Sequence, residues 1–309
     1  MAHEYHTPVL VEEVLTFLHP VPRGIYVDGT LGGGGHAEHM LTLCSPDGRL
    51  IGFDQDNDAL VTARERLARF GDRVTYRKEN FSALGAALRA LGVGKVNGIL
   101  LDLGVSSHHL DAVERGFSFQ ADAPIDMRMD RDQVLDGGAV VNTYAPEALA
   151  KIFWTYGEER NAKRIVRAIV RERERHTIES TGELAVIVDS AVGGRFLRKT
   201  LARVFQAIRI EVNRELEHLA LALRQSVDAL ETGGRIAVIS YHSLEDRIVK
   251  DFFRDEARTV IPSGHALIAD TPVEPRLRLL TRKPVEASPD ECGRNPRSRS
   301  AKLRAAERI

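Results

Sequence analysis

The sequence predicts an α/β fold, a doubly wound parallel sheet into which a helical domain is inserted. Over the first hundred residues, short apolar runs alternate with helical patterns, as in sheets built from β-α-β units. The runs are almost continuously apolar, which is typical of strands buried on both faces. Between Asp102 and Arg235 the alternation stops, and the pattern becomes loop-rich and then helical.

Apolar spacing defines each element of the sheet domain in turn. In the second predicted helix, for example, Leu60, Ala63, Leu67 and Phe70 recur at helical spacing. A final strand follows a glycine-containing turn at residues 232–234. In chain order, the pattern predicts a strand at 25–27, a helix at 37–44, a strand at 50–53, a helix at 58–70, a strand at 74–76, a helix at 82–91, a strand at 99–101 and a strand at 235–240.

The interruption predicts a mostly helical insert. Residues 111–142 are polar and loop-rich, and the last helical pattern after them runs back into the sheet domain. We therefore expect a sheet domain over residues 1–110 and 214–309 and an inserted helical domain over residues 111–213. The helical patterns of this region cover residues 146–156, 158–175, 182–192 and 201–230.

Composition excludes several classes of protein. The 309 residues contain two cysteines, Cys44 and Cys292, which lie too far apart for a zinc motif or a disulfide framework. The first residues are partly acidic and lack a long apolar stretch, so we expect neither a signal peptide nor a membrane span, and a cytoplasmic location. The net charge of −1 lacks the basic excess of proteins that bind nucleic acid indiscriminately, so any such binding would depend on local patches.

A glycine-rich turn directly follows the first predicted strand. Asp28 ends that strand, and the turn GTLGGGGH runs from Gly29 to His36. Glycine permits positive φ and lets backbone N–H groups approach a ligand closely, so the turn is typical of a nucleotide-type cofactor site. Gly29, Gly32 and Gly35 give the spacing G-x-x-G-x-x-G, which differs from the dinucleotide spacing G-x-G-x-x-G.

Three acids identify the cofactor more specifically. Asp28, Asp54 and Asp102 each follow an apolar run, so their carboxylates would converge where doubly wound sheets bind ligands. Such a cluster would repel a pyrophosphate but attract the sulfonium and ammonium groups of S-adenosylmethionine, and Asp54 could accept hydrogen bonds from its ribose. A purely structural turn with incidental acids is the alternative.

The loop after the fourth strand has the acceptors that methylation of an exocyclic amine requires. The lone pair of such an amine is delocalised, so a carboxylate that orients it would help. Asp102 could do this, hold the ammonium group of the cofactor, or cap the following turn. Phe81 could pack against adenine or belong to the core, and His36 and His109 could bind the cofactor or serve packing alone.

Basic segments are candidates for phosphate contacts. The run from 294 to 304 could bind RNA or form a mobile tail. His242, Glu245 and Asp246 favour substrate positioning or helix capping over a metal site, and we expect no metal. One helical face of the insert could contact phosphates or simply be solvated, and it carries Arg160, Arg164, Arg167, Arg171 and Arg175.

A colinear set of motifs spans nearly the whole chain. The motifs are HTPVL (6–10), DGTLG (28–32), GGH (34–36), DLGVSS (102–107), RGFSF (115–119), DMRMD (126–130), YGEE (156–159), FQAIRI (205–210), VN (212–213), HSLEDR (242–247) and NPRSRSAKLR (295–304). Together they make the chain similar to the bacterial family of methyltransferases that modify the exocyclic N4 amine of a cytosine in small-subunit ribosomal RNA.

The resemblance implies a Rossmann-type class I methyltransferase sheet, S-adenosyl-L-methionine as methyl donor, and substrate recognition by the insert. At the last cofactor position the family usually has glutamine where this chain has His109, and before Arg203 it often has His-Pro-Ala where this chain has Lys199-Thr-Leu-Ala. The cofactor pocket implied by the resemblance is lined by Gly34, Gly35, His36, Asp54, Phe81 and Asp102.

We therefore expect a ribosomal RNA cytosine-N4 methyltransferase that transfers the methyl group directly, with Asp102 as its catalytic residue. No cysteine is placed to attack the base. A ribosomal particle is the partner that the resemblance suggests, and a homodimer stays open. The rivals are an RNA-binding ribosome-assembly factor without catalysis, a nicotinamide dehydrogenase, and a methyltransferase for DNA or small molecules. Weaker candidates for the base pocket are Ser106, Ser107, His242 and Ser243.

Overall fold

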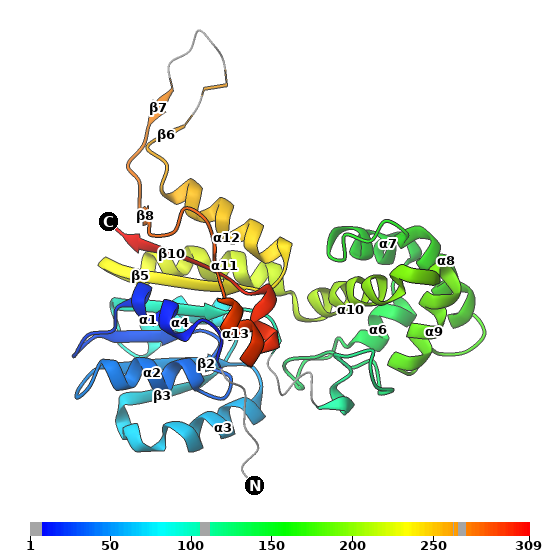
Figure 1. Cartoon of the computed structure of the whole chain (residues 1–309), viewed down its shortest axis with the longest axis horizontal. Helices are drawn as coiled ribbons and strands as arrows, with labels where there is room; N and C mark the ends of the chain where they lie inside the picture. Colours follow the sequence, from blue (N-terminus) through cyan, green and yellow to red (C-terminus); the bar gives the residue numbers. More distant parts are fainter. Residues whose placement is uncertain (1–7, 106–111, 262, 265–269) are drawn as a thin grey trace. The chain divides into compact units, whose positions relative to one another are not determined.

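The computed structural model describes residues 8–105, 112–261, 263–264 and 270–309, which form two compact units. The sheet unit comprises Met1–Gly104 and Leu216–Ile309, and the helical unit comprises Val105–Glu215. Each unit has its own hydrophobic core, and Figure 1 labels the elements of both.

The sheet unit contains the predicted doubly wound sheet, so the expected fold class is confirmed. Strands β1 to β5 are parallel, and β10 runs antiparallel beside β5. The strand order reverses between β1 and β4, the point at which such sheets bind ligands. In hydrogen-bonded order, the described strands are β3 (Val74–Lys78), β2 (Arg49–Asp54), β1 (Ile25–Asp28), β4 (Val96–Asp102), β5 (Leu230–Ser240), β10 (Lys302–Arg308) and β8 (Leu277–Leu279), with β9 (Val285–Glu286) beside β10.

Helices cover both faces of this sheet (Figure 1). Successive strand residues point to opposite faces, so Tyr26 and Leu100 join one core and Val27 and Ile99 join the other. Burial on both faces is the physical reason for the continuous apolar runs. The first core includes α1 (Val11–Leu18), α2 (Gly35–Leu43) and α3 (Asn57–Leu67), and the second includes α4 (Leu84–Ala90), α11 (Glu215–Ala229) and α12 (Ser243–Glu256).

Shorter elements complete the sheet unit. The predicted turn at 232–234 is a bulge inside β5, because the register against β4 shifts there. Beyond α12, two short strands pair as an antiparallel ribbon (Figure 1). These shorter elements are β6 (Val260–Ile261), β7 (Thr271–Pro272), α13 (Pro289–Arg294), η1 (Ala68–Arg73), η2 (Phe81–Ala83) and η5 (Pro296–Ser300).

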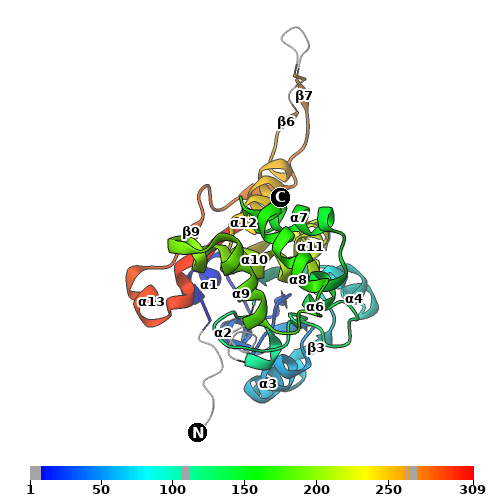
Figure 2. The same cartoon turned by 90° about the vertical axis from the view of Figure 1, so that its right-hand side faces the viewer.

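The helical unit packs around Phe153, Ile165 and Phe205, which are all buried. Helix α6 begins inside the region predicted as loop, where the Asp136 side chain accepts a hydrogen bond from the Ala139 N–H. Figure 2 shows this unit from the front. Its helices are α6 (Gly137–Thr143), α7 (Pro146–Thr155), α8 (Ala162–Arg173), α9 (Thr181–Val192) and α10 (Leu197–Asn213), with η3 (Val113–Arg115) and η4 (Gly194–Phe196).

Two predicted helices are wrong in their extent. The expected helix over 201–230 is divided at Arg214, whose φ of 49° is left-handed and ends α10. The buried Asn213 side chain secures this end, since it donates to the Met127 carbonyl and accepts from the Met129 N–H. The helix predicted from residue 158 begins at Ala162, because Glu158 also has a positive φ of 48°. Within the described part of the chain, no helix has the length and apolar character needed to cross a membrane.

Candidate cofactor and catalytic site

The three predicted acids end adjacent parallel strands. Asp28 ends β1, Asp54 ends β2 and Asp102 ends β4. The pKa of Asp28 is raised to about 7, mainly by burial and to a lesser extent by the negative charges of Asp102 and Asp54. His36 and the hydrogen bond from the Thr30 N–H lower the pKa of Asp28. The carboxylates therefore share one electrostatic environment at the strand-order reversal.

Hydrogen bonds from the strand ends hold the glycine-rich turn. The Gly29 N–H donates to the Leu100 carbonyl at 2.9 Å, and the Gly32 N–H donates to Oδ2 of Asp54 at 2.8 Å. Gly32 and Gly34 have φ values of 51° and 80°, which disfavour other residues. A side chain at Gly34 would also lie 3.2 Å from Leu67. The turn thus needs glycine both for its conformation and for close packing.

Helix α2 starts directly after this turn with Gly34 as its N-cap. No side chain among the described residues accepts a hydrogen bond at this cap, so the first-turn N–H groups remain directed out of the helix end. Such a helix end attracts a carboxylate. At Gly35 a side chain would lie 3.0 Å from Pro8, so close packing also favours glycine there.

Asp102 is held from two sides. The Tyr241 hydroxyl donates a 2.9 Å hydrogen bond to its Oδ1, and Nε2 of His36 lies 3.6 Å from its Oδ2. The Thr30 hydroxyl accepts the Asp102 N–H at 2.6 Å. The described contacts of the Asp102 carboxylate are therefore with the side chains of Tyr241 and His36 and not with backbone N–H groups of the following turn. This favours a role of Asp102 in the site over a role as the cap of that turn.

Tyr241 is the site residue that the sequence analysis missed. It follows β5, and its ring packs against Gly104, where a side chain would lie 3.3 Å from the ring and where φ is 94°. Burial raises the pKa of Tyr241 well above its ordinary value, and the charge of Asp102 and its hydrogen bond add to this rise. The hydroxyl is therefore a donor at neutral pH. The sequence signal for Tyr241 is its position between the end of β5 and the HSLEDR motif.

The remaining predicted cofactor residues have different outcomes. Phe81 begins η2 and is partly buried against the core of the sheet unit. This agrees with the interpretation of Phe81 as a core residue. His36 is buried, and neither of its ring nitrogens has a hydrogen-bond partner among the residues that the structure describes. His109, Ser106 and Ser107 lie outside the described residues.

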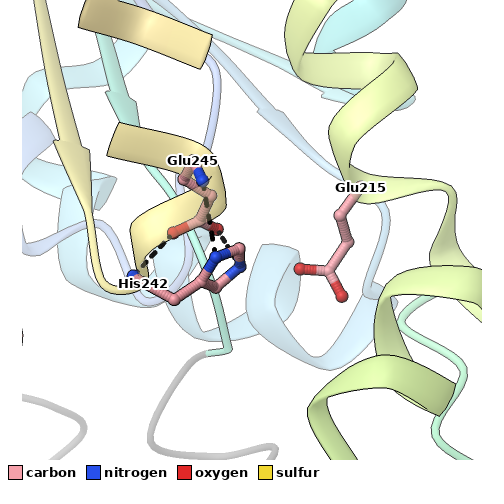
Figure 3. Close-up of side chains that lie close together, drawn as sticks. All are labelled: Glu215, His242 and Glu245. Atoms are coloured by element: carbon pink, nitrogen blue, oxygen red, sulfur yellow. Dashed lines mark hydrogen bonds and ion pairs between the residues drawn. The ribbon is translucent and has the colours of Figure 1, made fainter. Parts of the chain in front are cut away.

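The HSLEDR motif caps helix α12, as one of its interpretations predicted. Figure 3 shows the reciprocal hydrogen bonds, in which the Glu245 N–H donates to Nδ1 of His242 and the His242 N–H donates to Oε2 of Glu245. Glu215, also drawn, accepts hydrogen bonds from Arg209 at 2.8 and 2.9 Å. Ser243 is the exposed first residue of the capped helix.

The two basic segments differ in structure. The carboxy-terminal run is no mobile tail, because it continues into β10 within the sheet. Arg304 is buried there, with Nε 2.6 Å from Oδ1 of Asp246. In the helical unit, the predicted arginine stripe is exposed, although Arg160 precedes α8 and Arg175 follows it.

Comparisons with known proteins identify the family of this chain. The sequence model of the MraW methylase family matches residues 3–309. A protein of Syntrophotalea carbinolica named ribosomal RNA small subunit methyltransferase H is 50% identical over 308 residues, which cover 98% of each chain. A protein of the same name from Heliobacterium modesticaldum is 47% identical over 313 residues, 99% of each chain. With a match of this extent, the chain belongs to the MraW methylase family.

Proposed function

We propose that this protein methylates the exocyclic N4 amine of a specific cytidine in small-subunit ribosomal RNA, with S-adenosyl-L-methionine as methyl donor. The observation that carries the proposal is the shared environment of Asp28, Asp54 and Asp102 at the strand-order reversal. Carboxylates there stabilise a cationic methyl donor and disfavour an anionic dinucleotide. The full-length similarity to proteins named for small-subunit ribosomal RNA supports the substrate.

The residues of the sheet unit fit this cofactor. When bound, S-adenosylmethionine supplies an electrophilic methyl group on a sulfonium. Asp54, which ends β2 and accepts hydrogen bonds from the N–H groups of Gly32 and Asp56, would also accept hydrogen bonds from the ribose hydroxyls. The open N–H groups at the start of α2 would bind the carboxylate. The ring nitrogens of His36 are buried and form no hydrogen bond with a described residue, which fits a polar ligand. The proposed pocket comprises Gly34, Gly35, His36, Asp54, Phe81, Asp102 and His109.

Asp102 is the proposed catalytic residue. Its carboxylate would accept an N–H of the target amine, direct the nitrogen lone pair at the methyl group and stabilise the positive charge that develops on nitrogen. The Tyr241 hydroxyl, bonded to Oδ1, limits the rotation of this carboxylate and so acts as a positioning residue. After transfer the amine loses one proton, which solvent can accept.

The wider assignments are part of the same proposal. Residues 111–213 would recognise the substrate, and the RNA would be presented in a ribosomal particle in the cytoplasm. The exposed arginines of α8 supply positive charge in this region.

Mass spectrometry of small-subunit ribosomal RNA tests the proposal. RNA from cells without this protein should lack one N4-methylcytidine, which the wild-type gene should restore and an Asp102→Ala gene should not. Unchanged methylation in the deletion would overturn the proposal and favour an assembly factor. Calorimetry is a second test. Binding of NAD without binding of S-adenosylhomocysteine would indicate a dehydrogenase and would overturn the proposal.

A further inference from the structure

We infer that residues 193–199 of the helical unit form a surface on which an unpaired RNA base stacks, with neighbouring cations bound to phosphates. We call these residues the stacking segment. The inference rests on the proposed function, in which RNA is the substrate. It adds which residues contact the RNA and through which interactions.

An exposed aromatic ring lies at the centre of the stacking segment. Phe196 is 63% exposed at the start of α10, and the guanidinium of Arg195 lies 4.9 Å from its ring centroid. Isolated exposed apolar residues are common on protein surfaces, so an exposed ring alone does not indicate a binding surface. The residues around Phe196 are therefore the evidence for one.

The cations around Phe196 have no acidic partners in the described part of the chain. Arg195, Arg198 and Lys199 are all exposed, and none forms an ion pair with another residue that the structure describes. By contrast, Arg203 and Arg209 on the same helix pair with Glu159 and Glu215. The sequence contains no acid between residues 190 and 210. The segment is therefore a local positive patch on a chain whose net charge is −1.

The backbone places these side chains together. Gly193 and Gly194 have φ values of 51° and 75°, which turn the chain from α9 into α10. Phe196 is the N-cap of α10, and no described side chain accepts from the N–H groups that begin this helix. The positive end of a 17-residue helix thus adds to the charge of the cations.

This combination fits single-stranded RNA better than duplex. Unpaired bases stack on aromatic rings and on guanidinium planes, and the phosphates bind to cations that have no acidic partner. The arginine stripe of α8 has cations without an exposed aromatic residue among them, so it suits phosphates alone. Trp154 is equally exposed, but of these two rings only Phe196 has a described guanidinium beside it, that of Arg195, so we assign the stacked base to Phe196.

Substitution of Phe196 tests the stacking. With unmethylated small-subunit ribosomal RNA as substrate, Phe196→Ala should raise the KM for RNA about tenfold and leave kcat within twofold, whereas Phe196→Tyr should retain the wild-type KM. Val186 on α9 is an equally exposed apolar residue, at 69%, so Val186→Ala is the matched control and should change neither value. Affinity for S-adenosylhomocysteine should be unchanged in all three.

A fluorescence measurement reports stacking directly. Trp154 is the single tryptophan of the chain. In a Trp154→Phe, Phe196→Trp protein, the tryptophan at 196 should be quenched when unmethylated RNA is added, because a base covers its ring. The wild-type protein, with Trp154 alone, gives the reference signal.

Salt dependence tests the phosphate contacts. Replacing Arg195, Arg198 and Lys199 with serine should reduce the slope of log affinity against log salt by about 2, the loss expected for three single-strand phosphate contacts. Replacing Arg23, Lys250 and Arg254, three exposed cations of the sheet unit that pair with acids, removes the same charge and should leave the slope unchanged.

The outcomes separate the inference from the proposed function. If the wild-type protein methylates neither free small-subunit ribosomal RNA nor a ribosomal particle, the proposed function fails. If it does, but Phe196→Ala keeps the wild-type KM and the tryptophan at 196 is not quenched, the stacking surface is wrong. If free RNA and particles are both methylated, an effect of Phe196→Ala seen only with particles would indicate a contact with ribosomal protein and would overturn the inference.

Discussion

The buried guanidinium of Arg304 lies 2.6 Å from the carboxylate of Asp246, although the two residues are 58 positions apart. This ion pair joins the last strand, β10, to helix α12. A basic residue that resembled part of an RNA-binding tail is therefore a structural residue of the sheet.

Removal of one partner of this pair should destabilise the protein. Arg304→Ala leaves the half-buried Asp246 carboxylate with Lys302 at 3.9 Å as its remaining cation, so the free energy of unfolding should fall by about 3 kcal/mol. Urea unfolding measures this. The control is Arg299→Ala, an exposed residue nearby, which should change stability by less than about 0.5 kcal/mol. Equal stability of both variants would contradict the structural role.

Substitution of Asp102 should abolish most of the activity without unfolding the protein. Asp102→Asn keeps the shape of the side chain but removes its charge, so kcat should fall by about 100- to 1000-fold. Single-turnover methylation of ribosomal RNA measures the chemical step. Circular dichroism and the melting temperature should match those of the wild type. A kcat near the wild-type value would exclude Asp102 as the catalytic residue.

Tyr241→Phe removes only the hydroxyl that donates to Asp102. We expect kcat to fall about tenfold, because the carboxylate is less well oriented. The decisive measurement is a double-mutant cycle with Asp102→Asn. If Tyr241 acts through Asp102, its substitution should cost little more once Asp102 is changed. Fully additive losses would show that Tyr241 acts independently of Asp102.

The raised pKa of Asp28 predicts a pH-dependent stability. The pKa is about 7 in the folded protein and about 3.9 in an unfolded chain, so the folded state binds more protons between these values. Its contribution to stability is complete below about pH 4 and is lost as the pH rises through about 7. Thermal unfolding should show this decline in the wild type and a flatter profile in Asp28→Asn, which can still accept the Thr30 N–H.

The same group should make cofactor binding pH-dependent. A cationic donor favours the ionised form of Asp28, so S-adenosylmethionine should bind more tightly at pH 8 than at pH 6 and release a proton on binding near pH 7. Calorimetry in buffers of different ionisation enthalpy measures that proton. Loss of proton release in Asp28→Asn would identify its source, and unchanged release would assign it to another group.

Much of the fold and of the candidate site was predictable because the signals are local. Strands such as Ile25–Asp28 and Val96–Asp102 are recognisable by their apolar runs, and the topology of β-α-β units places their carboxyl ends together. The environment shared by Asp28, Asp54 and Asp102 follows from that rule. Which residue hydrogen-bonds with Asp102 does not, since Tyr241 is 139 positions away.

The sequence by itself thus determined the parallel strands of the sheet, the glycine-rich turn and the identity of the acids that end these strands, because these depend on periodicity and on residue type. Only the tertiary structure decided that the helix over 201–230 breaks at Arg214, that the carboxy-terminal run becomes β10, and that Tyr241 positions Asp102. These features arise from contacts between segments distant along the chain, and local periodicity carries no information about which distant partner a side chain will meet.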